Sequence, residues 1–397
     1  MSPSKPGKIF SSGLSVDPDW KKAVREIASH VHKDLKDEPC DLLIAFVSES
    51  YAGFDAAAFV NELSKTIANR VLIGCNSSGV IGDTREVEMQ PALSLLAMHL
   101  PGVKIYPFQM SETQLSSLNT GADLVNFFDI YPPDRPHFIC LSDPGTFDVV
   151  KFLQIFNEGY KGLPAIGGLA SGMVMGAPNW LCLNGNVYAE GMVGVALVGD
   201  IEFDVIVAQG SRPVGKPFVI TKAEGNVLYE LAGRSSLEVV RELIESLSPE
   251  DRKLAEFSLS VGLVMNEQQS DFKRGDFLNR NLVGFDPDAQ ALMIGANLKV
   301  GQTLQFQVRD ARTSSEDLRH LLETIPSVSG SAPRAGMLVS CCGRGRDFYG
   351  KADHDIKLIQ SLQGPLPVTG FFADGEIGPV GLKNFVHGYT SSLILFR

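Results

Sequence analysis

Two cysteines and two arginines are clustered in the segment Cys341-Cys342-Gly343-Arg344-Gly345-Arg346. Arginines held by glycine-rich turns can bind a carboxylate or a phosphate through paired hydrogen bonds. Neighbouring cations can also turn a thiol into a nucleophile, which makes Cys341 and Cys342 candidates for covalent chemistry. The competing interpretations are a flexible turn whose arginines pair with local acids, and inert buried thiols.

A second candidate segment is Gly370-Phe371-Phe372-Ala373-Asp374-Gly375-Glu376. Asp374 and Glu376 are two residues apart, so on a strand they would share a face. Paired carboxylates can bind a ligand amine or act as acid and base, and Phe371 and Phe372 would form a wall. The alternative is a turn at Asp374-Gly375 with a solvated Glu376. His387 lies nearby in the sequence, but a lone histidine in a strand is typically a hydrogen-bonded structural residue.

The glycine spacing of this segment occurs three times, in Gly74-Cys75-Asn76-Ser77-Ser78-Gly79, Gly167-Gly168-Leu169-Ala170-Ser171-Gly172 and Gly370 to Gly375. A repeated motif of this kind indicates a repeated structural unit. No lysine follows the second glycine and no helix begins there, which excludes a phosphate-binding loop. The structural interpretation is a tight turn between strands. The functional one is that small residues leave room for a ligand, so Asn76, Ser77 and Ser171 are candidate contacts.

The elements around these motifs predict the fold class. Apolar runs predict strands at 40–47, 137–141 and 337–341, and each is followed by a helix and a second strand that enters a glycine turn. Strands at 93–98, 192–198 and 392–396 return, and 203–208 is expected beside 192–198. We therefore predict an α/β protein with two lobes of mixed β-sheets covered by helices, built from repeated strand–helix–strand–glycine turn–strand units.

The segment between the second and third copies does not repeat this unit. A linker at 211–217 places a boundary near 215, which predicts domains at 1–215 and 216–397. Runs at 257–265, 291–294 and 302–308 predict further strands. Ser314-Ser315-Glu316-Asp317 has the spacing of a capping box before a helix. Arg280, beside Asn281 and ahead of a strand, is a further candidate ligand contact, with a solvated loop as the default.

Composition narrows the classes of function. The 397 residues are 44% hydrophobic and 20% charged, which predicts a well-buried core. A net charge of −11 disfavours nucleic acid and anionic membranes as partners. No apolar run reaches the ~18 residues of a membrane span, and no secretory signal is visible. The six cysteines and seven histidines show no metal-binding spacing, so we expect a cytoplasmic protein with reduced thiols and no metal or cofactor.

The chain resembles a tandem of FIST N-terminal and C-terminal domains over nearly its full length. The N-terminal likeness is carried by 71–79, 164–168 and 191–195, and the C-terminal likeness by 275–281, 342–346, 370–379 and 387–390. The resemblance implies an intracellular signal-transduction module that senses small ligands, with amino acids proposed. Family members carry the module fused to bacterial output domains or to a eukaryotic F-box. We find room for neither here, so we expect output through a separate partner.

The leading prediction is a non-catalytic sensory module that binds a small polar metabolite. Arg344 or Arg346 would take its carboxylate, and Asp374 or Glu376 its amine. Two alternatives stay open: a protein-interaction scaffold like the substrate-recruiting module of F-box proteins, with a ubiquitin-type partner, and a cysteine-dependent enzyme with His354 or His387 as base. The candidate ligand contacts are Asn76, Ser77, Ser171, Arg280, Cys341, Cys342, Arg344, Arg346, Phe371, Phe372, Asp374, Glu376 and His387. The ligand model expects the three glycine turns to converge with the arginine-bearing turn on a shared hollow.

Overall fold

The computed structural model of the protein describes residues 7–172, 178–269, 271–272, 275–325 and 330–397. The chain divides into two compact units, of which unit 1 comprises Met1–Val207 with Arg319–Arg397 and unit 2 comprises Ala208–Leu318. Helices and mixed sheets occur together, so the predicted α/β class is confirmed. The boundary near residue 215 stays a prediction about the two halves of the sequence.

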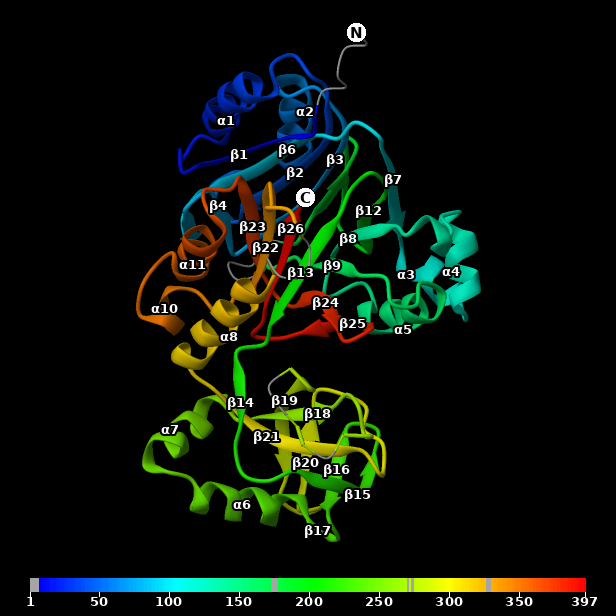
Figure 1. The fold of residues 1–397 in the computed structure, drawn as a ribbon, viewed down its shortest axis with the longest axis vertical. Helices are drawn as coiled ribbons and strands as arrows, with labels where there is room; N and C mark the ends of the chain where they lie inside the picture. Colours follow the sequence, from blue (N-terminus) through cyan, green and yellow to red (C-terminus); the bar gives the residue numbers. More distant parts are fainter. Residues whose placement is uncertain (1–6, 173–177, 270, 273–274, 326–329) are drawn as a thin grey trace. The chain divides into compact units, whose positions relative to one another are not determined.

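Unit 1 contains three copies of one arrangement: a leading strand, a central strand, a helix, a second central strand, a hairpin and a closing strand (Figure 1). Copy 1 consists of β1 (Ile9–Ser15), α1 (Trp20–Leu35), β2 (Cys40–Ser48), α2 (Ala56–Thr66), β3 (Asn69–Ser77), β4 (Gly79–Gly82), β5 (Arg85–Glu88) and β6 (Leu93–His99). Copy 2 consists of β7 (Val103–Met110), α3 (Glu112–Ser117), α4 (Gly121–Phe128), the 3-10 turn η1 (Pro132–Asp134), β8 (His137–Ser142), α5 (Val149–Gly159), β9 (Ala165–Leu169), β10 (Leu181–Leu183), β11 (Asn186–Tyr188) and β12 (Met192–Gly199). Copy 3 consists of β13 (Phe203–Ala208), β22 (Ala335–Cys341), α10 (Arg346–Tyr349), α11 (His354–Gln363), β23 (Val368–Ala373), β24 (Glu376–Val380), β25 (Lys383–His387) and β26 (Ser391–Phe396).

Each copy completes the sheet of another copy. The three sheets run β1-β6-β2-β3-β10-β11, β25-β24-β9-β8-β12-β7 and β13-β26-β22-β23-β4-β5. The hairpin β10–β11 of copy 2 therefore extends the sheet of copy 1, β24–β25 of copy 3 extends that of copy 2, and β4–β5 of copy 1 extends that of copy 3. In the last of these pairings Val80 lies opposite Phe371. The exchange of hairpins closes a ring of three.

The three sheets face a common apolar core. Residues from the central strands of all three copies, among them Phe46, Ile139 and Val339, form one buried cluster. The rings of Phe46 in copy 1 and Phe371 in copy 3 stack with their centroids 4.6 Å apart. Helices lie on the outer faces, as α1 and α2 do over the sheet of copy 1 (Figure 1). Central strands buried on both faces explain why their sequences read as nearly continuous apolar runs.

The first glycine of each repeated motif is required by close packing between parallel strands. Its register partner lies on the preceding central strand, as Gly74 lies opposite Ala45. A Cβ atom placed on Gly74, Gly167 or Gly370 would lie 2.2, 1.8 or 2.0 Å from the carbonyl oxygen of Ala45, Cys140 or Leu338, respectively. Any side chain there would collide with backbone, which accounts for the glycine in all three copies. In copies 1 and 3 the turn that follows joins strands of two different sheets.

Unit 2 is a closed barrel with helices. It contains β14 (Ser211–Pro213), β15 (Phe218–Glu224), β16 (Val227–Leu231), β17 (Arg234–Ser235), α6 (Ser236–Ser246), α7 (Pro249–Ser258), β18 (Ser260–Val264), β19 (Phe277–Asp286), β20 (Ala291–Ile294), β21 (Thr303–Arg309) and the start of α8 (Ala311–Thr324). The strand order β21-β15-β16-β20-β19-β18 returns to β21, because β18 pairs with β21. Closure leaves these six strands without a free edge, while β14 pairs with β21 and β17 with β16 outside the circuit. Along the chain, unit 2 is inserted between the leading strand and the central strands of copy 3.

Two local expectations from the sequence are wrong. β13 pairs with β26 rather than with β12, because β7 already occupies the open edge of β12. The residues read as a capping box lie inside α8, which begins at Ala311. The Asp310 carboxylate accepts the Thr313 N–H at 2.7 Å, and the Ser314 hydroxyl donates to the carbonyl of Gly210. Within the described residues, the helices are too short or too polar to cross a membrane.

Candidate functional site

The three glycine turns meet in unit 1, as the ligand model expects. The Ser171 hydroxyl of copy 2 accepts the Ser78 N–H of copy 1 at 3.0 Å and donates to the Phe372 carbonyl of copy 3. Between copies 2 and 3, the Leu169 N–H donates to the Gly375 carbonyl at 2.9 Å. The convergence follows from the exchange of hairpins, since each turn is the point at which the chain passes into the next sheet.

The small polar residues at this junction bond to other parts of the protein. Asn76 accepts the Trp180 N–H at 2.8 Å and donates to the Pro178 carbonyl at 3.3 Å. The Ser77 hydroxyl donates to the carbonyl of Gly79 at 2.7 Å, and its side chain is fully buried. Phe371 and Phe372 are buried as well. The structure thus brings these candidate contacts together and packs them directly against one another; the shared hollow stays a prediction.

Arg344 forms the centre of a buried polar network. Its side chain is 0% exposed, and its Nε donates to Asp355 Oδ2 at 3.0 Å. Nη2 donates to the Tyr349 hydroxyl at 2.6 Å, and Nη1 to the Tyr389 carbonyl at 3.4 Å. Burial would raise the pKa of Asp355, but the Arg344 charge outweighs it and lowers that pKa to about 2. The guanidinium is therefore committed to partners within its own copy.

Two glutamates of copy 1 hold the arginine-bearing turn of copy 3 from outside. Glu86 Oε1 accepts the N–H of Ile356, in the first turn of α11, at 2.8 Å. Glu88 Oε1 accepts the N–H of Arg346 at 2.9 Å. α11 needs a cap from elsewhere, because Asp353 at its N-cap has a φ of 62° and no capping side-chain bond. The hairpin β4–β5 therefore fixes the turn between β22 and α11.

We predict that Glu86 makes the protein less stable as the pH rises. Burial, and then the Asp355 charge, raise the pKa of Glu86 from 4.5 to about 8; Asp353 and Glu88 face it too. Between these values the folded protein binds one proton that the unfolded chain releases, so the unfolding free energy falls by up to ~1.4 kcal/mol per pH unit. The unfolding free energy, measured with urea at several pH values in this range, should fall less steeply with pH for Glu86→Gln than for the natural protein. Buried Glu376 acts in the same direction and remains in both proteins, so only the difference between them reports on Glu86. The same pH dependence of the unfolding free energy in both would contradict the assignment.

Cys341, Cys342, Asp374 and Glu376 gather where the parallel strands β22 and β23 end. The Cys342 N–H donates to the Ala373 carbonyl at 2.9 Å, which ties the two strand ends together. Cys342 and Asp374 are exposed, whereas Cys341 and Glu376 are buried. Burial, and then the neighbouring Cys341 thiol, raise the pKa of Glu376 well above its usual value, and burial also raises that of Asp374.

The remaining candidates occupy separate positions. Arg346 is exposed in the turn after β22, and its backbone rather than its side chain holds Glu88. Nε2 of His387 lies 3.0 Å from the Gly378 carbonyl, and Nδ1 of His354 lies 2.9 Å from Asp355. Arg280 belongs to unit 2, on β19, where burial lowers its pKa to about 10. Among the described residues, no group of three or more His, Cys, Asp or Glu side chains is placed to hold a metal ion.

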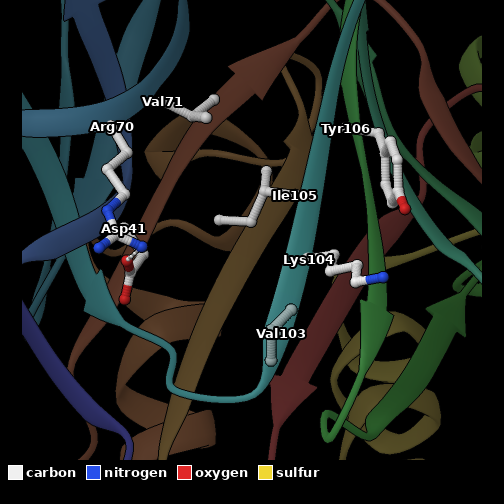
Figure 2. Close-up of a pocket in the computed structure, with 7 residues that line it drawn as sticks. All are labelled: Asp41, Arg70, Val71, Val103, Lys104, Ile105 and Tyr106. Carbon is white, nitrogen blue, oxygen red and sulfur yellow. Dashed lines mark ion pairs between the residues drawn. The ribbon is translucent and has the colours of Figure 1, made fainter.

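A cavity of about 420 Å³ lies elsewhere in unit 1, beside β3 and β7. Figure 2 shows Arg70 and Asp41 facing each other as an ion pair, with an N–O distance of 2.9 Å. Ile105 extends from β7 toward this pair, whereas Lys104 and Tyr106 extend to the other side, as alternate residues of a strand do. The lining combines the apolar side chains of Val71, Val103 and Ile105 with charged Asp41, Arg70 and Lys104 and with Tyr106. Sequence reasoning did not identify this cavity, because its residues come from three separate segments and form no motif.

Sequence reasoning also missed Glu86, Asp355 and Tyr349. Glu86 is 270 positions from the residue whose N–H it accepts, so no local spacing links them. Asp355 lies in the first turn of α11, where an acidic residue is ordinary helix chemistry. One sequence signal was usable: two arginines between glycines, with acidic residues nearby. It indicated an ion pair but did not identify Asp355 as the acidic partner.

Comparison with known proteins identifies the family to which the chain belongs. The model of the FIST N domain matches residues 41–234, and that of the FIST C domain matches 236–379. An uncharacterized protein of Mycobacterium tuberculosis is 34% identical over 97% of this chain and 98% of its own, and one of Mycobacterium bovis is 33% identical over 97% of both. A solved cyanuric acid hydrolase covers 98% of this chain and 100% of its own at 10% identity, but its TM-score of 0.31 supports no argument.

Proposed function

The chain belongs to the FIST family, and from that premise we propose that it is a sensory module that binds a small amine-bearing metabolite without transforming it. The binding site is the strand-end surface, which we define as Cys342, Arg346 and Asp374, with Glu376 buried close by. The module acts in the cytoplasm and passes its signal to a separate partner protein.

The observation that supports this position is the exposed carboxylate at the ends of two parallel strands. Ligands of α/β proteins commonly bind outside the carboxyl ends of such strands. Asp374 follows β23 directly, and the turn that bears Cys342 and Arg346 follows its parallel neighbour β22. Copies 1 and 2 both contact this surface, since Glu88 accepts the Arg346 N–H and the Leu169 carbonyl accepts the Asp374 N–H, so a bound ligand would act on the junction between copies.

The charges favour an amine with a nearby anionic group. Asp374 can accept hydrogen bonds from an ammonium, and Arg346 has an exposed guanidinium that can pair with a carboxylate. Arg344, which the sequence offered for that role, is fully occupied by Asp355, Tyr349 and Tyr389. Burial raises the pKa of Glu376 well above its usual value, which disfavours a second negative charge beside Asp374.

We predict that an amino-acid panel contains a ligand that raises the melting temperature, and that Asp374→Asn abolishes the effect. At a ligand concentration of 100 Kd the folded state gains ~2.7 kcal/mol, which a thermal shift measures readily. Asp347→Asn is the matched control, because Asp347 is an exposed acid in the same turn region. A panel that stabilises neither the natural protein nor the control contradicts the proposal.

The cavity beside Arg70 offers the competing location for a bound ligand. Arg70→Gln removes the charge there and leaves the strand-end surface intact, because the two sites lie on different strands. If the thermal shift disappears in Arg70→Gln and survives in Asp374→Asn, the ligand occupies the cavity and the strand-end site is wrong.

A further inference from the structure

Cys341 and Cys342 are consecutive cysteines in opposite environments. Cys341 is the last residue of β22 and is 7% exposed, whereas Cys342 opens the following turn and is exposed. Hydrogen bonds hold both residues, from the Cys341 N–H to the Thr390 carbonyl at 3.0 Å and from the Cys342 N–H to the Ala373 carbonyl. The two thiols belong to consecutive residues, whose Cα atoms are ~3.8 Å apart.

The surroundings favour a thiolate on Cys342. The hydrogen bond from the Cys341 side chain lowers the pKa of Cys342 and outweighs the effects of burial, Asp374 and Glu376. The same hydrogen bond, followed by burial and the Cys342 charge, raises the pKa of Cys341. The pair therefore has one sulfur ready to attack and one held in reserve.

We propose that Cys341 and Cys342 form a thiol–disulfide exchange site that reduces low-molecular-weight disulfides. The Cys342 thiolate attacks one sulfur of the disulfide, forms a mixed disulfide and releases one thiolate, which takes a proton from solvent. The Cys341 sulfur then attacks the Cys342 sulfur, releases the second thiolate and gives its proton to it. Two protein thiols are oxidised to one disulfide, and one small disulfide is reduced to two thiols.

Formation of the mixed disulfide makes the second exchange step easier. The hydrogen bond and the negative charge that suppress Cys341 both come from Cys342. Both are lost once the Cys342 sulfur is bound in the mixed disulfide, so the Cys341 thiol becomes easier to ionise at the moment it is needed. The site does not depend on the proposed metabolite, because it uses only the two sulfur atoms and an accessible face at Cys342.

The other four cysteines are expected to react slowly with disulfides in the folded protein. Cys40, Cys75, Cys140 and Cys182 are all buried, and burial raises the pKa of each thiol. Buried thiols of this kind react slowly with disulfides while the protein is folded. A thiol count on the native protein therefore reports on the consecutive pair alone.

The test is reaction of the full chain with 2,2′-dithiodipyridine, a neutral disulfide whose thione product absorbs light. We expect the natural protein to release two thiones, retain no adduct and lose two hydrogen atoms by mass spectrometry. Cys341→Ser should release one thione and retain one pyridylthio group, and Cys342→Ser should release none at comparable times. Circular dichroism of each variant before reaction establishes that it is folded.

Three outcomes would overturn the proposal. They are rapid release by folded Cys342→Ser, a stable adduct on the natural protein, and no reaction of the natural protein before it unfolds. Because buried Cys341→Ser risks unfolding, Cys341→Ala is a second variant with the same expected single release. Dithiothreitol should restore both thiols of the natural protein.

Discussion

Replacing Arg344 with methionine is expected to lower the free energy of unfolding by about 3–5 kcal/mol. The substitution preserves most of the side-chain volume and removes the guanidinium that donates to both carboxylate oxygens of Asp355. Asp355 keeps the His354 ring at 2.9 Å and the Ser340 hydroxyl at 3.5 Å, but a buried carboxylate that has lost its guanidinium is far less favourable than one in water. Hydrogen bonds to the Tyr349 hydroxyl and the Tyr389 carbonyl are lost as well. Urea unfolding followed by circular dichroism measures the change.

Two further variants separate the charge from the packing. Arg346→Met is the matched control, and because its side chain is exposed we expect a change within about 0.5 kcal/mol. Arg344→Met combined with Asp355→Asn removes both charges and should recover part of the loss. Without Arg344 the pKa of Asp355 rises, so the single variant should regain stability as the pH falls through that raised value. A double variant as unstable as the single one would show that the ion pair is not the cause.

Replacing Gly370 with alanine is expected to destabilise the protein by about 3 kcal/mol or more. The new methyl group would lie 2.0 Å from the Leu338 carbonyl oxygen and 3.2 Å from its Cα, so it can be accommodated only if β22 and β23 separate. These strands carry the two turns of the strand-end surface. The loss should appear as a lower urea midpoint, and Gly74→Ala in copy 1 should behave alike, because its methyl group meets the Ala45 carbonyl at 2.2 Å.

The control for this prediction lies on the neighbouring strand. A Cβ on Gly336 of β22 would meet its nearest atom, on Val368, at an ordinary 3.4 Å. Alanine in a strand interior is favoured over glycine by roughly 0.5–1 kcal/mol, so Gly336→Ala should leave stability unchanged or slightly increased. If Gly370→Ala and Gly336→Ala have the same effect, close approach of the backbone does not explain the repeated glycines.

The repeat and its strands could be predicted from sequence because their signals are local. Apolar runs mark strands buried on both faces, such as β2 and β22. The destination of each hairpin could not be predicted, since β4 pairs with β23 through contacts between residues far apart in the chain. For the same reason the sequence read the glycine turn as a local feature, whereas its two strands belong to different sheets.

The candidate site was only partly visible for the same physical reason. Glycine-held arginines near acids indicated ion pairing, but composition does not show which arginine is buried. Arg344 is enclosed because α11 presents Asp355 to it, and α11 is fixed by Glu86 from another copy. Exposure of Cys342 beside buried Cys341 also depends on where β22 ends. These are consequences of tertiary packing, which local spacing does not encode.

The ring of exchanged hairpins has a consequence for how the protein is made. The sheet of copy 3 needs β4 from the beginning of the chain and β23 from its end. While the polypeptide is being synthesised, the edge of β4 that pairs with β23 must therefore wait until the chain as far as Ala373 has left the ribosome. Bringing together such distant segments is slow. Nascent copy 1 thus exposes an unpaired strand edge during translation, which is the moment at which a chaperone would be needed.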